Sequence, residues 1–177
     1  MARPRNRATP KRAPQFSPHT LHYAPTWVFT AVEHWNGECV GYHVSKRGTR
    51  YEAIEAIARG ITQHCGAPRP RVARGLSLRM DNCSQYMSAH FVNQGNYWGI
   101  QPSFALVGCS KANGVAERFN RTLREQVTHS QIFQNVAELR KAICEFVDRY
   151  NALWRLEKNG FLTPKEAREA YTLRNVA

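Results

Sequence analysis

Acidic residues are scarce in this sequence, and none occurs before Glu33. Lysine and arginine number 25 against 13 aspartates and glutamates, which gives a formal net charge of +12. Such an excess of positive charge favours a polyanionic partner, with nucleic acid ahead of an acidic membrane surface. A basic protein without such a partner is the alternative that charge alone leaves open.

Long hydrophobic runs, a secretory leader and paired cysteines are also missing. The longest apolar run, Trp27 to Val32, is far shorter than the ~20 residues of a membrane span. The N-terminus carries arginine and proline without the apolar stretch of a signal peptide. The five cysteines form an odd set with no C-x-x-C pair, which is typical of the reducing cytoplasm. We therefore expect no membrane insertion and no zinc site.

Two regions differ in composition. Five of the nine prolines and five basic residues lie within residues 1–25. This composition predicts a basic, proline-rich disordered arm over 1–25, which either follows a phosphate backbone or is a solvated tail. Residues 26–177 read as one globular domain, and a chain of 177 residues can bury a sufficient core without disulfides.

Hydrophobic periodicity and turn residues predict an α/β protein. Asn36-Gly37 is a strong hairpin signal between two apolar runs. Apolar residues at helical spacing, with capping residues such as Asn135 and Thr163, predict the helices. The expected order is a hairpin of Trp27–Val32 with Glu38–Ser45, helix Arg50–Cys65, strand Leu76–Met80, helix Ser88–Tyr97, strand Ile100–Ala105, helix Val115–Ser130, and helices from Asn135 and Thr163.

Asp81 and Glu117 are the candidate metal ligands. Asp81 directly follows the strand ending at Met80, at the edge of an α/β sheet where ligands bind. Glu117 lies in the first turn of a helix that follows a glycine-bearing loop. Carboxylates from a strand end and a helix start can converge on Mg²⁺, which two-metal phosphoryl transfer requires. In the structural alternative, Asp81 caps the next turn and Glu117 offsets its helix dipole.

Two stretches of sequence stand out as motifs. One is Asp81-Asn82-Cys83-Ser84-Gln85-Tyr86-Met87-Ser88 with Gly99-Ile100, and the other is Asn113-Gly114-Val115-Ala116-Glu117-Arg118-Phe119-Asn120-Arg121-Thr122-Leu123. Together they resemble the integrase catalytic core, the family of retroviral integrases and of transposases from bacterial insertion sequences. The closing Tyr150-Asn151, with Gly160 and Thr163-Pro164, is similar to the tail of the insertion-sequence members. The resemblance extends from about Thr26 to Ala170.

This resemblance implies an RNase H-like fold, a mixed sheet flanked by helices. It implies a three-acid site for Mg²⁺ (or Mn²⁺), with Asp81 as the second acid and Glu117 as the third. It also implies cutting and joining of DNA, with transposon ends and target DNA as partners. We accordingly expect a homo-oligomer in the bacterial cytoplasm, associated with the nucleoid when bound to DNA.

The departures from the family concern the first acid and one glycine. The family's first acid is an Asp in a Trp-x-x-Asp context on a strand before the hairpin, whereas this chain has only the aspartates Asp81 and Asp148. The first strand is therefore missing or degenerate, and its acid would fall near 13–20, where no acid occurs. Glu33 is a candidate substitute, but a role at the hairpin end is the favoured interpretation. Cys83 replaces the usual glycine of Asp-Asn-Gly-Ser, and we expect it to crowd the turn behind Asp81.

Basic residues near Glu117 are the candidate DNA contacts. Arg121 and Arg124 follow Glu117 by four and seven residues, so a helix places all three on one face. Their guanidinium groups can hold a DNA end while the carboxylate binds metal. The alternative is a solvated Glu–Arg pair. The full set expected to contact DNA is Lys111, Asn113, Arg118, Arg121 and Arg124.

Two functional hypotheses follow. In the first, the chain is the catalytic-core portion of an insertion-sequence transposase, N-terminally incomplete through a frameshift or a wrong start, and inactive without its first acid. In the second, it is a non-catalytic DNA-binding or oligomerisation module that modulates an intact transposase. In either case we predict that Pro18 to Ala24 partly fills the place of the first strand, because buried strand edges without partners are costly.

Overall fold

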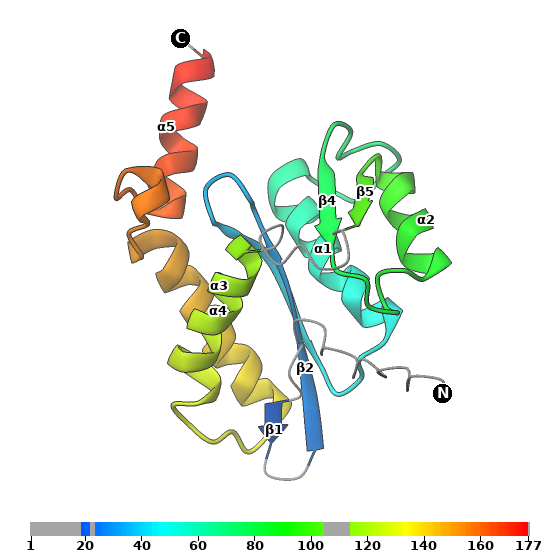
Figure 1. Cartoon of the computed structure of the whole chain (residues 1–177), viewed down its shortest axis with the longest axis vertical. Coiled ribbons are helices and arrows are strands. Elements are labelled where there is room, and N and C mark those ends of the chain that lie inside the picture. Colours follow the sequence, from blue (N-terminus) through cyan, green and yellow to red (C-terminus); the bar gives the residue numbers. More distant parts are fainter. Residues whose placement is uncertain (1–18, 22–23, 105–113, 177) are drawn as a thin grey trace, which may run out of the picture.

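A computed structural model describes residues 19–21, 24–104 and 114–176 (Figure 1). No helix in these ranges is long and apolar enough to cross a bilayer. The strands are β1 (His19–Leu21), β2 (Ala24–Val32), β3 (Cys39–Ser45), β4 (Ser77–Met80) and β5 (Gln101–Phe104). The helices are α1 (Arg50–Cys65), α2 (Ala89–Trp98), α3 (Gly114–Leu123), α4 (Val136–Leu153) and α5 (Pro164–Val176), with a π-helical turn at Arg124–Thr128 and a 3₁₀ turn at Glu157–Asn159.

Capping residues set the helix starts that the sequence predicts. The Asn135 side chain accepts a hydrogen bond from the Glu138 backbone N–H at 2.9 Å, at the start of α4. At α5, the Glu166 N–H donates to the Thr163 hydroxyl, while the Thr163 N–H donates to the Glu166 carboxylate. This reciprocal pair is a capping box, and it satisfies two backbone donors that the first helical turn leaves unpaired.

The predicted hairpin forms as antiparallel β2 and β3, with Val28 opposite Val44. Gly37 adopts a positive φ of 75° in the turn, a conformation that glycine reaches without steric cost. Asn151 of α4 pairs with the backbone of Cys39 in both directions, accepting from its N–H and donating to its carbonyl. The Tyr150-Asn151 motif therefore has a structural role: it fixes α4 against the start of β3.

Helices cover both faces of this hairpin (Figure 1). On one face, α3 and α4 bury a core in which Phe119 packs against Phe146 and Tyr150. On the other face, Phe29 packs in a second core with α1, β4 and α2. β2 and β3 thus form the central layer, and each helix layer keeps its own apolar cluster.

The sheet is divided, which the sequence analysis did not predict. β1, β2 and β3 form one antiparallel sheet, and β4 and β5 form a separate parallel pair. Within the described residues no strand joins β2 to β4, so the expected mixed sheet is present as two parts. β1 lies on the edge of β2 opposite β3, with His19 opposite Thr26. Three residues of the predicted Pro18 to Ala24 segment form a strand, but in the described residues it pairs with β2 only at Ala24 to Thr26 and not with β4, so the place between β2 and β4 is not filled by it.

Candidate active site

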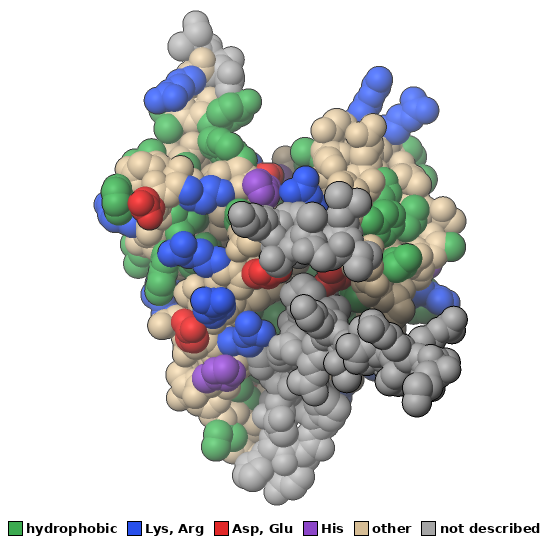
Figure 2. Space-filling model, viewed as in Figure 1, with side chains coloured by type: hydrophobic (Ala, Val, Ile, Leu, Met, Phe, Trp, Pro, Cys, Tyr) green, Lys and Arg blue, Asp and Glu red, His purple; other side chains and the backbone are tan. Residues whose placement is uncertain are grey.

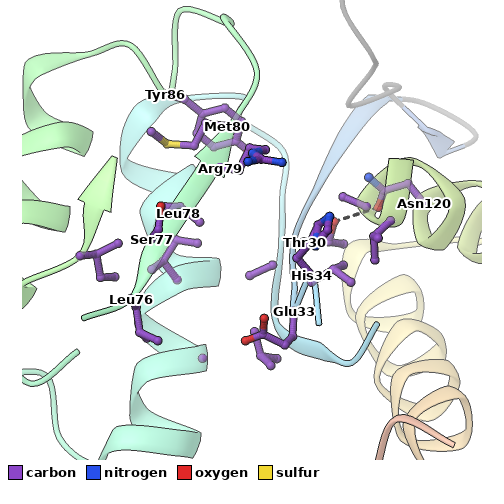
Figure 3. Close-up of a pocket in the computed structure, with 18 of the residues that line it drawn as sticks. Thr30, Glu33, His34, Leu76, Ser77, Leu78, Arg79, Met80, Tyr86 and Asn120 are labelled. Atoms are coloured by element: carbon purple, nitrogen blue, oxygen red, sulfur yellow. Dashed lines mark hydrogen bonds between the residues drawn. The ribbon is translucent and has the colours of Figure 1, made fainter. Parts of the chain in front are cut away.

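A cavity of about 590 Å³ lies between β2 and β4, where the two parts of the sheet separate. Figure 3 shows Thr30, Glu33 and His34 on one side of it and Leu76, Ser77 and Leu78 on the other. We call this cavity the cleft. Its charged and polar lining includes Glu33, His34, His64, Arg79, Asp81, Glu117, Asn120, Arg121, Arg124 and Arg168.

Asp81 reaches the cleft because β4 ends at Met80, one residue earlier. Its carboxylate is the one buried acid group of the described residues whose oxygen, Oδ1, lacks a hydrogen-bond partner. A buried polar atom without a partner carries a free-energy cost, which a bound cation would relieve. Asp81 therefore has the chemical character of a metal ligand.

Glu117 enters the cleft from the first turn of α3. One turn further along, Asn120 accepts a hydrogen bond from the Thr30 hydroxyl at 2.8 Å, which fixes α3 against β2 (Figure 3). The structure thus brings the two acids of the sequence motifs to one cleft, from a strand end and a helix start.

Glu33 lines the same cleft from the end of β2. Its carboxylate accepts a hydrogen bond from the Trp35 backbone N–H at 3.3 Å, and its backbone carbonyl accepts from Gly37. These bonds support the hairpin turn. In the described part of the chain, no three His, Cys, Asp or Glu side chains are grouped closely enough to hold a metal ion. The donor set is therefore smaller than the three-acid set that the resemblance implies.

The candidate DNA contacts are divided by the structure. Arg121 and Arg124 line the cleft beside Glu117, as their spacing predicts. Arg118 is exposed on α3 but does not line the cleft, and Lys111 and Asn113 lie outside the described residues. Lysine and arginine side chains are spread over the α3 and α4 side of this face (Figure 2).

Sequence reasoning missed the basic residue that α5 brings to the cleft. Arg168 lines the cleft. It also pairs with the buried carboxylate of Glu38, which directly precedes β3 and lies 130 residues earlier in the sequence. Asn36 also fixes α5, because its side chain donates to the Pro164 carbonyl at 2.9 Å. Burial, and then the nearby Arg168 charge, lower the pKa of His64 at the same rim. Since no local pattern links such distant positions, nothing in the sequence signalled this cluster.

Cys83, which replaces the family's glycine, is half-buried and packs against the α1 and α2 core. Burial, followed by the hydrogen bond to Asp81, raises the pKa of the Cys83 thiol to about 12. The thiol is therefore protonated at neutral pH and lies next to the Asp81 carboxylate. The substitution places a weak proton donor beside a candidate metal ligand.

We expect Cys83 to resist alkylation. With its pKa at about 12, only a small fraction is thiolate at pH 8, so iodoacetamide should modify it roughly 10³-fold more slowly than an ordinary thiol. The rate should rise with pH up to that pKa, and Asp81→Asn should accelerate it because the neighbouring negative charge is removed. Peptide mass spectrometry measures this against the exposed Cys144. Equal rates for the two cysteines would contradict the placement of Cys83 beside Asp81.

The fold and the cleft define a class of protein: an RNase H-like α/β core with acids at a strand end and a helix start. The catalytic core domain of BIV integrase superimposes with a TM-score of 0.60 at 21% identity, covering 85% of this chain and 91% of that one. The HTLV-2 integrase catalytic core domain in complex with magnesium gives a TM-score of 0.55 at 19% identity, covering 75% of this chain and 78% of that one. These likenesses establish the fold.

Sequence comparison establishes the family. Residues 98–164 match the family model described as integrase core domain. The transposase for insertion sequence element IS629 of Shigella sonnei is 30% identical over 154 residues, which are 84% of this chain and 50% of that protein. This chain belongs to the integrase core family, together with insertion-sequence transposases. It spans about half the length of the curated relatives it matches.

Proposed function

We propose that this chain is the catalytic-core portion of an insertion-sequence transposase, a protein of DNA transposition that holds DNA ends at the cleft. The observation that carries the proposal is that the two motif acids, Asp81 and Glu117, line one cleft with the arginines of α3. The arginines supply phosphate contacts, and the acids supply the metal ligands. The partners are transposon ends and target DNA, and the protein acts as a homo-oligomer in the bacterial cytoplasm.

Asp81 and Glu117 are the residues that would hold Mg²⁺ or Mn²⁺. Oxygen ligands suit these hard cations, and the partnerless Oδ1 of Asp81 is available for one. A bound divalent cation would stabilise charge on phosphate oxygens and lower the pKa of an attacking water. With two carboxylates in place of three, we expect the binding to be weak.

The first acid is the part of the site that this chain lacks. Phosphoryl transfer is fast when the attacking oxygen is positioned in line and the developing charge is stabilised. Asp81 and Glu117 can hold one cation, but among the described residues no third carboxylate is grouped with them to complete the arrangement. We therefore propose that the site binds DNA and metal without turning over.

A second candidate function is a non-catalytic DNA-binding or oligomerisation module that modulates an intact transposase. It is favoured by the absence, among the described residues, of three grouped metal-ligating side chains. Both candidates share the DNA surface and differ in catalysis. Recovery of activity on addition of the missing strand distinguishes them, because only a catalytic core would regain it.

We expect the double substitution Arg121→Ala/Arg124→Ala to weaken DNA binding uniformly across sequences. Each arginine that neutralises a phosphate releases a counterion, so the slope of log K against log salt should flatten by up to about two units. Fluorescence anisotropy on duplexes of unrelated sequence, at several salt concentrations, measures both effects. The matched control is Arg69→Ala/Arg149→Ala, two exposed arginines outside the cleft lining. An unchanged slope for the cleft pair would show that this face does not touch DNA.

A further inference from the structure

A second basic surface lies outside the cleft, in the loop between α1 and β4. Between Glu55 and Glu117 the sequence has one acid, Asp81, against six lysines and arginines. Arg71 and Arg74 of this loop are exposed, and in the described part of the chain neither guanidinium group pairs with a carboxylate. Two unneutralised cations in a region so poor in acid attract polyanions.

Backbone hydrogen bonds fix the position of these two arginines. The Arg71 N–H donates to the carbonyl of Tyr97, near the end of α2, at 2.9 Å. The Arg74 N–H closes a turn on the Arg71 carbonyl at 3.1 Å, and Ala73 between them is buried. We call residues 71–74 the arginine turn. Both of its guanidinium groups therefore leave one turn whose backbone is bonded to a helix.

Arg71 holds a backbone conformation that costs free energy. Its φ is 58°, in the left-handed region that residues with a Cβ rarely adopt. Gly99 lies against the turn, because a Cβ added there would stand 3.1 Å from the Cα atoms of both Arg71 and Arg74. This close approach holds the two arginines in place. A strained and exposed arginine indicates that its side chain serves a function other than stabilising the fold.

The arginine turn and Asp81 lie at opposite ends of β4. The turn leads into this strand from above in Figure 1, and the segment from Leu76 to Asp81 lines the cleft. Five extended residues span about 17 Å, and duplex DNA rises about 3.4 Å per base pair along each strand. A duplex that follows this wall of the cleft therefore meets the arginine turn about five base pairs away from Asp81.

We propose that the arginine turn holds the phosphate backbone of the same duplex that lies in the cleft. This inference rests on the proposed function, because the cleft supplies the other part of the DNA path. The planar guanidinium group of arginine can bind a phosphate through two parallel hydrogen bonds. Contacts to the DNA backbone carry no sequence information, so the turn orients the duplex and does not select its sequence.

Fluorescence anisotropy on a duplex of about 20 base pairs, at several salt concentrations, tests this contact. Arg71→Ala/Arg74→Ala should weaken binding about tenfold or more and flatten the slope of log K against log salt by up to about two units. Combined with Arg121→Ala/Arg124→Ala, the flattening should equal the sum for the two pairs, because one duplex then loses both sets of contacts.

The matched control is again Arg69→Ala/Arg149→Ala. It removes the same number of charges, and one of them comes from the same loop, between Pro68 and Pro70 and ahead of the arginine turn. We expect the control pair to change the salt slope little. An equal flattening by the control pair would overturn the inference, because any charge on this loop would then suffice.

Arg71→Gly separates the loss of the DNA contact from a loss of folding. Glycine adopts a positive φ without steric cost, so this variant should melt about 2–4 °C above Arg71→Ala and bind DNA as weakly as Arg71→Ala does. DNA binding by Arg71→Gly that matches the unmodified chain would overturn the inference.

The two arginine pairs distinguish this inference from the proposed function. An unchanged slope for Arg71→Ala/Arg74→Ala, with a flattened slope for Arg121→Ala/Arg124→Ala, would overturn the inference and leave the proposed function standing. A combined flattening no larger than that of either pair would also overturn it, since one duplex would not then touch both surfaces. Flattening by Arg71→Ala/Arg74→Ala alone would support the DNA contact of the turn and contradict the proposed function.

Discussion

The unmodified chain is expected to show no detectable cutting or joining of DNA ends in Mg²⁺ or Mn²⁺. Asp81 and Glu117 line the cleft, but the described residues contain no third acid grouped with them. Effective molarities and in-line placement account for several kcal/mol of an enzymatic barrier, so a loosely held cation should lower the rate by orders of magnitude. Gel assays on labelled transposon ends, with long incubation and both metals, measure it.

Glu33 is the residue that could supply a third carboxylate and so make the unmodified chain active. It lines the same cleft, but its carboxylate accepts a hydrogen bond from Trp35 in the hairpin turn. A catalytic group must be held within about 0.5 Å of its productive position, and a longer side chain engaged in a turn does not meet that demand. Cutting by the unmodified chain that Glu33→Gln abolishes would identify Glu33 as the third ligand and contradict this account.

Gly41→Ala is expected to cause the largest loss of stability. A Cβ added at Gly41 would lie 2.1 Å from the Ala56 carbonyl oxygen and 3.0 Å from the Gly60 nitrogen, both in the backbone of α1. A rigid helix backbone cannot yield as a flexible side chain does, so α1 must move off β3. Overpacking of this kind costs about 3 kcal/mol or more, which corresponds to a melting temperature lower by roughly 6–12 °C.

Gly95→Ala is the matched control for that change. Gly95 lies inside α2, and apart from its chain neighbours and the α2 backbone, no atom of the described residues would stand within 4 Å of its added Cβ. Alanine in a helix interior should raise the free energy of unfolding by about 0.5–1 kcal/mol, because glycine loses more backbone freedom on folding. Thermal unfolding followed by circular dichroism measures both variants. A Gly41→Ala protein as stable as the unmodified chain would show that α1 does not press on β3.

Local chemistry made most of the fold predictable from sequence. The predicted bounds of Arg50–Cys65 coincide with α1, and the starts of α4 and α5 follow from their capping residues. The hairpin follows from Asn36-Gly37. The division of the sheet was not predictable in this way, because pairing of β2 with β4 depends on a strand between them rather than on either strand's own pattern.

The candidate site was predictable to the extent that its residues lie in motifs. Asp81, Glu117, Arg121 and Arg124 were selected from local context, and the structure places all four at one cleft. Arg168 was missed because its position depends on a buried ion pair with Glu38, far away in sequence. Periodicity describes which face of an element is buried, but it does not say which distant elements will meet.

Grafting a first strand that carries the acid tests the central proposal most directly, namely that this chain is an integrase core whose cleft lacks the first acid. An upstream strand carrying Trp-x-x-Asp, fused ahead of Thr26, should restore measurable cutting of transposon ends. Glu117→Gln in the fused protein should abolish the activity again, and Asn in place of the grafted Asp should prevent it. A folded fusion protein that binds DNA but cuts none, in Mg²⁺ and in Mn²⁺, would contradict the claim.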